Sequence, residues 1–160
     1  MSEQKGRARS VETLNVSGAR VAIIASRFNA FVVDRLVTGA QAALTAHGIN
    51  ADAITTLRVP GAYELPLAAN ALAKRGDYDA VVALGAVIRG ETAHFDFVCS
   101  ECSSGLMRVS LDFNIPIGFG VLTVDTEAQA LARASDQDNK GAEAAEAALE
   151  MITLLRCLHK

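Results

Sequence analysis

Residues 80–97 read AVVALGAVIRGETAHFDF. The apolar run Ala80–Leu84 predicts a buried strand that stops at Gly85. The polar residues that follow, His94 and Asp96 among them, predict a loop at the carboxyl end of this strand. Glycines let backbone N–H groups approach an anion, and a histidine can transfer a proton near neutral pH. Two interpretations carry similar weight: a reaction site, or a strand-to-helix turn with a surface histidine.

Strands and helices alternate on both sides of this stretch. The apolar run Arg20–Ser26, the β-branched run Ala53–Val59 and the run Ile115–Leu122 predict three further strands. A weaker alternation in Val11–Val16 predicts a short edge strand. Caps, glycines and helical spacing predict helices at about 30–47, 65–75, 98–109, 126–134 and 141–159, with Asn29 as the N-cap of the first and a capping box at Thr126–Gln129. Such βαβ units indicate an α/β fold with a parallel sheet.

Composition and charge exclude several classes of protein. The chain has 160 residues, of which 51% are apolar, and its net charge is −3. The length and the apolar content suit one domain with a sizeable core. The negative net charge gives no indication of a surface that binds nucleic acid or an anionic membrane. No apolar stretch reaches the roughly 20 residues of a membrane span, and residues 1–10 lack the apolar segment of a secretory signal. We therefore expect a cytoplasmic protein with a mobile segment at residues 1–13 and a single domain at residues 14–160.

The three cysteines are Cys99, Cys102 and Cys157. Cys99 and Cys102 have the C-x-x-C spacing. A redox role would need a reactive setting, and a zinc site would need two more ligands, for which no second Cys/His pair is present. We interpret them as reduced thiols without metal.

Three loops leave the carboxyl ends of predicted strands: Ser26–Asn29, Gly61–Glu64 and Gly85–His94. Ligands of open parallel sheets bind beyond these ends, so we expect the loops to meet at one crevice. Taken alone, individual residues also have ordinary structural interpretations. Phe28 could be a core residue and Glu64 a charge at the start of a helix.

The motifs in these loops and further along the chain occur together in a fixed order. They are Arg27-Phe28-Asn29, VPGAYE at 59–64, LGAVIRGETAHF at 84–95, FGVLT at 119–123, EAQA at 127–130 with Arg133, and Asn139-Lys140-Gly141. In this order they resemble the 6,7-dimethyl-8-ribityllumazine synthase family over about residues 14–158. Each motif is weak alone, but the set is specific.

The resemblance implies a fold, an activity and partners. The fold is a flavodoxin-like three-layer α/β/α sandwich with a four-stranded parallel sheet, and a segment near Leu14–Val16 adds a strand to the neighbouring subunit's sheet. The enzyme condenses 5-amino-6-(D-ribitylamino)uracil with 3,4-dihydroxy-2-butanone 4-phosphate without a cofactor, releasing phosphate and water. This is the penultimate step of riboflavin biosynthesis. The family forms homo-oligomers built on pentamers, and riboflavin synthase is a candidate partner.

The resemblance also implies roles for individual residues, with His94 as the general acid/base and Asp96 as a residue that could orient it. Residues for the pyrimidine and the ribityl chain are Phe28, Ala62, Tyr63, Glu64, Ala86, Val87, Ile88 and Phe119. Residues for the phosphate are Glu91, Thr92 and Arg133, with Lys140 as a further candidate. Alone, Arg133 would more commonly be a solvated arginine.

Some site residues reach the adjacent subunit in the family, namely those that match Phe119 and Arg133. Shell-forming members usually have a glycine in the linker that corresponds to Ser135–Asn139. This linker has none and is one residue shorter, so we expect a pentamer or decamer rather than a sixty-subunit shell. Ala86 stands where many relatives have threonine, and we expect a modest effect.

Two other functions compete with catalysis. A flavodoxin-like module could hold a flavin or lumazine without reacting, but such a carrier needs neither a proton donor at His94 nor a phosphate clamp at Arg133. A purely structural shell protein is disfavoured by the many polar groups at the strand ends.

Overall fold

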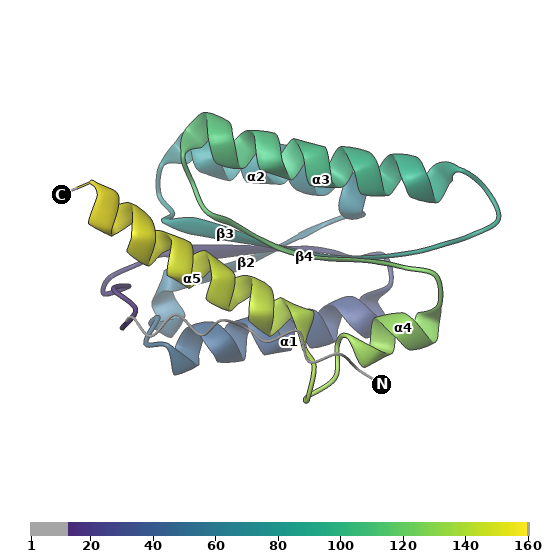
Figure 1. Cartoon of the computed structure of the whole chain (residues 1–160), viewed down its shortest axis with the longest axis horizontal. Coiled ribbons are helices and arrows are strands. Elements are labelled where there is room, and N and C mark those ends of the chain that lie inside the picture. The colour runs from purple at the N-terminus through teal and green to yellow at the C-terminus, as the bar shows by residue number, and fades with distance from the viewer. Residues whose placement is uncertain (1–12, 160) are drawn as a thin grey trace.

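The computed structural model describes residues 13–159, which form an α/β fold with helices on both faces of a sheet (Figure 1). The strands are β1 (Val21–Ser26), β2 (Ile54–Val59), β3 (Ala80–Ile88) and β4 (Ile117–Val124). The helices are α1 (Ala30–Ala46), α2 (Leu65–Arg75), α3 (His94–Phe113), α4 (Glu127–Ala132) and α5 (Lys140–Leu158), with short 3-10 turns η1 (Ala51–Ala53) and η2 (Ala62–Glu64).

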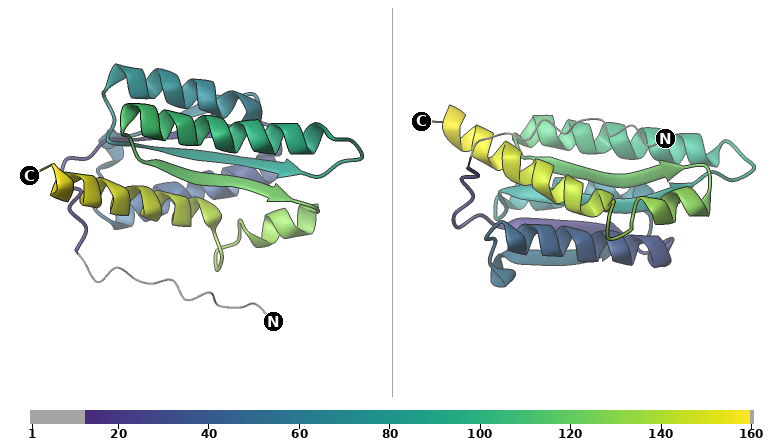
Figure 2. Two further views of the ribbon diagram at one scale, coloured as in Figure 1. Left: turned by 45° about the horizontal axis from the view of Figure 1, so that its top comes forward. Right: turned by 60° about the horizontal axis from the view of Figure 1, so that its bottom comes forward.

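The sheet is parallel throughout, with strand order β2-β1-β3-β4. Helices α1 and α5 cover one face, and α2 and α3 cover the other, as Figure 1 shows. All residues of β1 are buried because neighbouring strands and helices cover it on every side. The arrowheads of β3 and β4 point toward the same edge of the sheet (Figure 2), where the site is expected. The predicted fold class is confirmed.

Helices form where apolar residues recur at helical spacing. In α1, Val33, Leu36, Val37, Ala40 and Leu44 are buried, and they form the stripe that faces the sheet. The predicted capping box before α4 is present, since Thr126 Oγ1 accepts from Gln129 N and Gln129 Oε1 accepts from Thr126 N.

Helix α5 packs closely on its neighbours at two glycines. A Cβ atom at Gly141 would overlap the backbone carbonyl group of Leu36 in α1. One at Gly118 in β4 would overlap the backbone of Ala144 in α5. The two glycines therefore allow the backbones of three elements to approach more closely than any other residue would permit.

Several predicted boundaries are wrong in informative ways. Strand β3 does not stop at Gly85 but continues to Ile88, because β4 pairs with it through Ile88↔Val124. Strand β4 begins two residues later than predicted, at Ile117. Pro116 precedes the strand because it has no backbone N–H group to donate to the sheet, although its carbonyl oxygen accepts a hydrogen bond from Val81 N at 3.0 Å.

Helix ends differ as well. Asn29 precedes α1 in a left-handed conformation with φ 60°, and its side chain does not cap the helix. Helix α4 ends at Ala132 rather than Ala134, and the last helix begins at Lys140 rather than Gly141. The side chain of Asn139 caps this last helix by accepting from Ala142 N at 3.0 Å.

The described part of the N-terminal segment lies along α5. Residues 13–16 form no strand within the single chain, while residues 11 and 12 of the predicted edge strand lie outside the described residues. Asn15 N donates to Thr153 Oγ1 at 2.9 Å, and Arg156 Nη1 donates to the carbonyl oxygens of Asn15 and Ser17. The predicted mobile segment also lies outside the described residues, except for residue 13.

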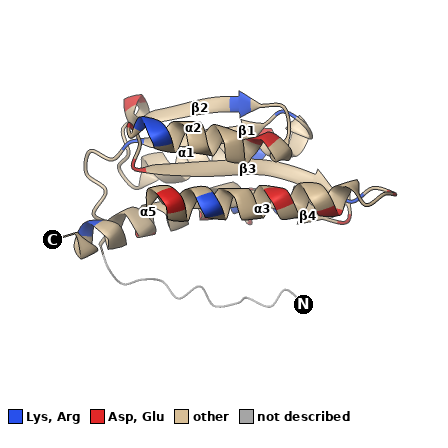
Figure 3. Ribbon diagram, turned by 90° about the horizontal axis from the view of Figure 1, so that it is seen from above, with Lys and Arg blue, Asp and Glu red and all other residues tan. Residues whose placement is uncertain are grey.

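Charged residues are dispersed over the described surface, and acidic and basic positions are interspersed along α3 (Figure 3). Within residues 13–159, none of the helices combines the length and apolarity needed to cross a bilayer.

Candidate active site

Residues from three loops line one cavity of about 720 Å³ at the carboxyl ends of β1, β2 and β3. The residues around it are Phe28, Asn29, Pro60, Gly61, Ala62, Tyr63, Glu64, Ala86, Val87, Ile88, Gly90, Thr92, His94, Phe95, Phe97 and Val98. The expected convergence of the three loops is therefore present in the structure.

Phe28 lies at the rim of this cavity. The backbone N–H groups of Arg27 and Phe28 donate to the carbonyl oxygens of Val59 and Pro60 at 2.8 and 3.1 Å, which fixes the first loop beside the second. The Phe28 side chain stays 72% exposed, so it is no part of the core. An exposed ring held by its backbone is suited to stacking on a flat ligand.

The second loop forms a tight turn around Gly61. Glu64 Oε2 accepts from Gly61 N at 2.9 Å, so one carboxylate oxygen is bound within its own turn. Ala62 is buried and Tyr63 is 60% exposed. The turn therefore presents backbone groups and one remaining carboxylate oxygen to the cavity.

The last residues of β3 form the wall of the cavity. Ala86 is buried, and Val87 and Ile88 are half-buried. The carbonyl oxygen of Ala86 accepts from Asn29 Nδ2 at 2.8 Å, so this acceptor is already occupied. The sequence assigned Asn29 to capping, and the amide instead joins the first loop to the third.

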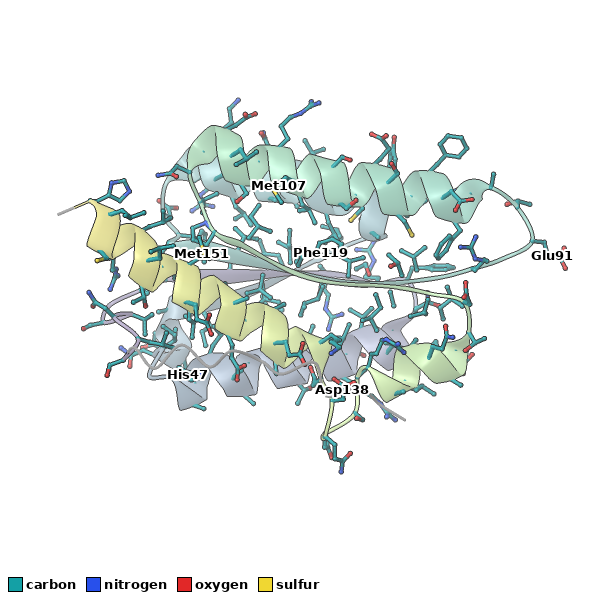
Figure 4. All side chains as sticks on the ribbon, viewed as in Figure 1. His47, Glu91, Met107, Phe119, Asp138 and Met151 are labelled. Atoms are coloured by element: carbon teal, nitrogen blue, oxygen red, sulfur yellow. The ribbon has the colours of Figure 1, made fainter. Side chains whose placement is uncertain are left out.

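The loop between β3 and α3 brings polar groups to the cavity. Thr92 and His94 both line it, and His94 N lies 3.4 Å from Thr92 Oγ1. His94 is exposed and is the first residue of α3. Glu91 does not line the cavity, and its side chain points away from the sheet at the tip of the loop (Figure 4). Only its backbone N–H therefore suits the predicted role toward phosphate.

Helix α3 supplies residues that the sequence reasoning missed. Phe95, Phe97 and Val98 line the cavity, and Phe95 is buried. His94, Phe97 and Val98 are spaced i, i+3 and i+4, which places them on one face of a helix. This spacing would have identified the three residues as one face of the helix if the helix had been predicted to begin at residue 94.

Arg89 contacts several groups beside the cavity. Its Nε donates to Asp125 Oδ1 at 2.8 Å, and its Nη1 lies 3.5 Å from Asp96 Oδ1. The hydrogen bond that Arg89 donates to Asp125 is the main reason why the pKa of Arg89 is raised, with burial opposing it. Asp96 was predicted to orient His94, but among the described residues its carboxylate contacts Arg89 instead.

Phe119, Arg133 and Lys140 do not reach this cavity. They line a second one of about 600 Å³ beside β4 and α5, with Phe119 in the middle of β4 (Figure 4). Arg133 Nη1 donates to Gln129 O at 3.0 Å. Lys140 Nζ lies 3.1 Å from both Asp138 and Glu143; burial lowers the pKa of Lys140, but these hydrogen bonds raise it on balance.

The two cysteines of the C-x-x-C pair, Cys99 and Cys102, offer no reactive thiolate. Burial raises the pKa of Cys102 to about 12 and also raises that of Cys99. A redox-active thiol has a lowered pKa, so neither is suited to that chemistry. Among the described residues, no group of His, Cys, Asp and Glu could hold a metal ion.

A comparison with protein families points to one of them. Residues 18–156 match the family model described as 6,7-dimethyl-8-ribityllumazine synthase. The matched range contains all four strands and both cavities. The resemblance carried by the sequence motifs is thereby confirmed.

Proposed function

The chain belongs to the 6,7-dimethyl-8-ribityllumazine synthase family, and from this membership we propose that the cavity lined by His94 is the place where it performs the family's reaction. The chain is a transferase of riboflavin biosynthesis. It condenses 5-amino-6-(D-ribitylamino)uracil with 3,4-dihydroxy-2-butanone 4-phosphate and releases phosphate and water. The family membership does not favour a non-catalytic flavin-binding module.

One observation carries the location of the reaction. Phe28, Glu64, Thr92 and His94 come from three loops and border the same cavity. The reaction needs a flat apolar surface for the pyrimidine, N–H groups and a cation for the phosphate, and a proton carrier. This cavity supplies each of these except the cation.

The pyrimidine would lie between Phe28 and the wall formed by Ala86, Val87 and Ile88. The ring stacks on Phe28, and the turn Ala62–Glu64 binds its edge through backbone groups. The free oxygen of the Glu64 carboxylate accepts hydrogen bonds from the ribityl hydroxyls. This arrangement leaves the amine of the pyrimidine directed toward the loop that carries His94.

The second substrate would bind with its phosphate at the β3–α3 loop, where the backbone N–H of Glu91 and the N–H and hydroxyl of Thr92 are the donors. The amine attacks the ketone, and His94 protonates the carbinolamine hydroxyl or the leaving phosphate. The protonated hydroxyl leaves as water to form a Schiff base, phosphate is then eliminated, and the ring closes with loss of a second water. Holding two substrates together would supply much of the rate enhancement.

The direct test is to mix both substrates with the protein and to follow lumazine absorbance together with phosphate release. We expect the two products in equal amounts. Inorganic phosphate should compete with the phosphate substrate, and a Thr92→Val variant should weaken this competition. If Thr92→Val and the wild type are inhibited equally, the phosphate lies elsewhere.

We also propose that Phe119, Arg133 and Lys140 complete the site of an adjacent subunit. These residues lie at a separate cavity within their own chain, beside the edge strand β4. In the proposed ring of head-to-tail contacts, one subunit's β4 edge would lie beside its neighbour's cavity. Arg133 would then supply the cation that the first cavity lacks, and the enzyme would be a homo-oligomer built on pentamers.

Mixed oligomers would test this shared site. His94→Ala and Arg133→Ala subunits, each inactive or slow alone, should regain activity when they are expressed together. About a quarter of the sites in a random ring of equal composition would combine an intact His94 with an intact Arg133. If Arg133 served its own subunit, no site would be intact and activity would not return.

Two further proposals concern the setting of the enzyme. As a member of the riboflavin pathway it would act in the cytoplasm, and riboflavin synthase, which follows in the pathway, would be a partner. Co-sedimentation of the two purified enzymes would test this partnership, and separate migration would contradict it.

A further inference from the structure

Arg89 directly follows β3, and its side chain joins segments that belong to different parts of the proposed site. It lines neither cavity, and the family resemblance assigned it no role. Its guanidinium nevertheless has more partners than any other side chain of the β3–α3 loop.

On one side, the guanidinium contacts the first turn of α3. Its Cζ atom lies 4.3 Å from the ring centroid of Phe95, a buried residue that lines the cavity. Its Nη1 lies 3.5 Å from Asp96 Oδ1. Phe95 and Asp96 directly follow His94, so these contacts hold the turn that carries the proposed proton carrier.

On the other side, Arg89 contacts the segment before α4. Its backbone N–H donates to Val124 O and its Nε donates to Asp125 Oδ1, both at 2.8 Å. Asp125 N in turn donates to Gln129 Oε1 at 2.8 Å, and Gln129 O accepts from Arg133 Nη1 at 3.0 Å. A continuous series of hydrogen bonds therefore runs from Arg89 to the arginine of the second cavity.

We propose that Arg89 is a positioning residue that sets the turn carrying His94 against helix α4, whose C-cap residue is Arg133. This inference rests on the proposed function. In the proposed ring, His94 serves its own subunit's site and Arg133 serves the neighbour's, so Arg89 fixes the relative placement of two adjacent sites.

The chemistry of the side chain supports this role. Single exposed ion pairs hold groups together only weakly. A planar guanidinium can engage two carboxylates and an aromatic face at once, which a lysine ammonium cannot reproduce. Arg89 therefore fixes the relative positions of the end of β3, the first turn of α3 and the segment before α4. No single one of its contacts would be strong enough to do so.

The test compares Arg89→Met with the matched control Arg35→Met. Arg35 is exposed on α1, and its side chain makes no ion pair within residues 13–159. For Arg89→Met we expect kcat to fall about tenfold and KM for the phosphate substrate to rise about tenfold, because small displacements at a site are costly. KM for the pyrimidine should change little, and Arg35→Met should match the wild type.

A merely structural role would give a different pattern. Loss of folded enzyme lowers kcat but leaves both KM values unchanged, so that pattern in Arg89→Met would overturn the inference. Unchanged kcat and KM would also overturn it. A wild-type protein that makes no lumazine would contradict the proposed function instead.

Partner variants keep the inference falsifiable even if Arg89→Met fails to fold. Asp125→Ala removes the acceptor of Arg89 Nε, and Asp125→Asn retains an acceptor oxygen. We expect Asp125→Ala to raise KM for the phosphate substrate and Asp125→Asn to remain within about threefold of the wild type. Equal KM values in Asp125→Ala and the wild type would overturn the inference.

Discussion

The hydroxyl of Ser26 is buried at the end of β1 without a hydrogen-bond partner among the described residues. An unpaired buried hydroxyl carries a desolvation cost that no bond offsets. Ser26→Ala should therefore raise the free energy of unfolding by about 1 kcal/mol, as measured by urea denaturation.

Ser110 provides the matched control, since its hydroxyl donates to Ile115 O at 2.7 Å. Ser110→Ala removes a satisfied bond and should lower the free energy of unfolding by about 1 kcal/mol. If both variants lose stability equally, Ser26 has a partner that the single chain does not reveal.

His94 is the residue on which the proposed chemistry depends most directly. His94→Ala should reduce kcat by about 10²–10⁴-fold, the usual contribution of one positioned proton carrier. Binding of the pyrimidine, followed by fluorescence titration, should remain, because His94 lies in the β3–α3 loop region and not at Phe28. His47→Ala, on the far side of the sheet from the cavity, should match the wild type. Lost pyrimidine binding with an unchanged kcat would contradict the assignment.

At the scale of elements, the sequence predicted whether a segment is a helix or a strand better than it predicted the residues at which the segment begins and ends. Continuous apolar runs identified β1 and β3, because strands that are buried on both faces show no alternation of apolar and polar residues. Strand β2 has no buried residue and was identified by its β-branched residues. The C-terminal end of β3 was predicted too early because Gly85 was interpreted as the residue at which the strand ends. In the structure a Cβ atom at Gly85 would lie 3.1 Å from Ser26 Oγ, so the glycine accommodates a side chain on the neighbouring strand. Such contacts between strands are not visible in a linear pattern.

The candidate site was likewise predictable in part. The loops were found by their position after strands, and the motif resemblance supplied the individual residues. The contacts of Arg89 with Asp125 and Asp96 were not predictable, because they depend on how a loop after β3 meets a loop after β4. Asn29 occupies the predicted N-cap position of α1, but the hydrogen bond from its side chain to Ala86 O was not predictable for a similar reason, since the two residues are 57 positions apart.

The packing of α5 on α1 gives a prediction at this scale. Gly141→Ala adds a Cβ atom that meets the Leu36 backbone, which cannot yield as a side chain would. We expect a loss of about 1–3 kcal/mol in the free energy of unfolding, measured by urea denaturation. Gly90→Ala is the control for stability, because its Cβ atom would meet nothing within 4 Å. Equal stability of both variants would show that α5 can shift.

At the scale of the whole molecule, large apolar side chains are exposed on α2 and α3 and also along β4 and α5. Leu67, Met107 and Leu111 on α2 and α3 are 74, 61 and 74% exposed. Phe119 and Met151 beside β4 are 49 and 43% exposed. Two unlike apolar surfaces suit the head-to-tail contacts of a ring.

The linker before α5 bears on the size of the assembly. Ser135 N donates to Asp138 O, and Asp138 N donates to Ser135 Oγ. Ala134 and Asn139 form an antiparallel β-bridge. A turn closed in this way resists the change of angle that a shell would require. Sedimentation velocity should therefore find a pentamer or decamer, and a particle near a megadalton would refute this expectation.

The amide of Asn29, which joins the loop after β1 to the Ala86 carbonyl, has a consequence for recognition. It ties two neighbouring parts of the cleft wall together before any substrate arrives. Much of the conformational entropy of these walls is thus lost during folding rather than during association. The empty enzyme should behave as a preformed receptor, whose encounter with the heterocycle demands little rearrangement.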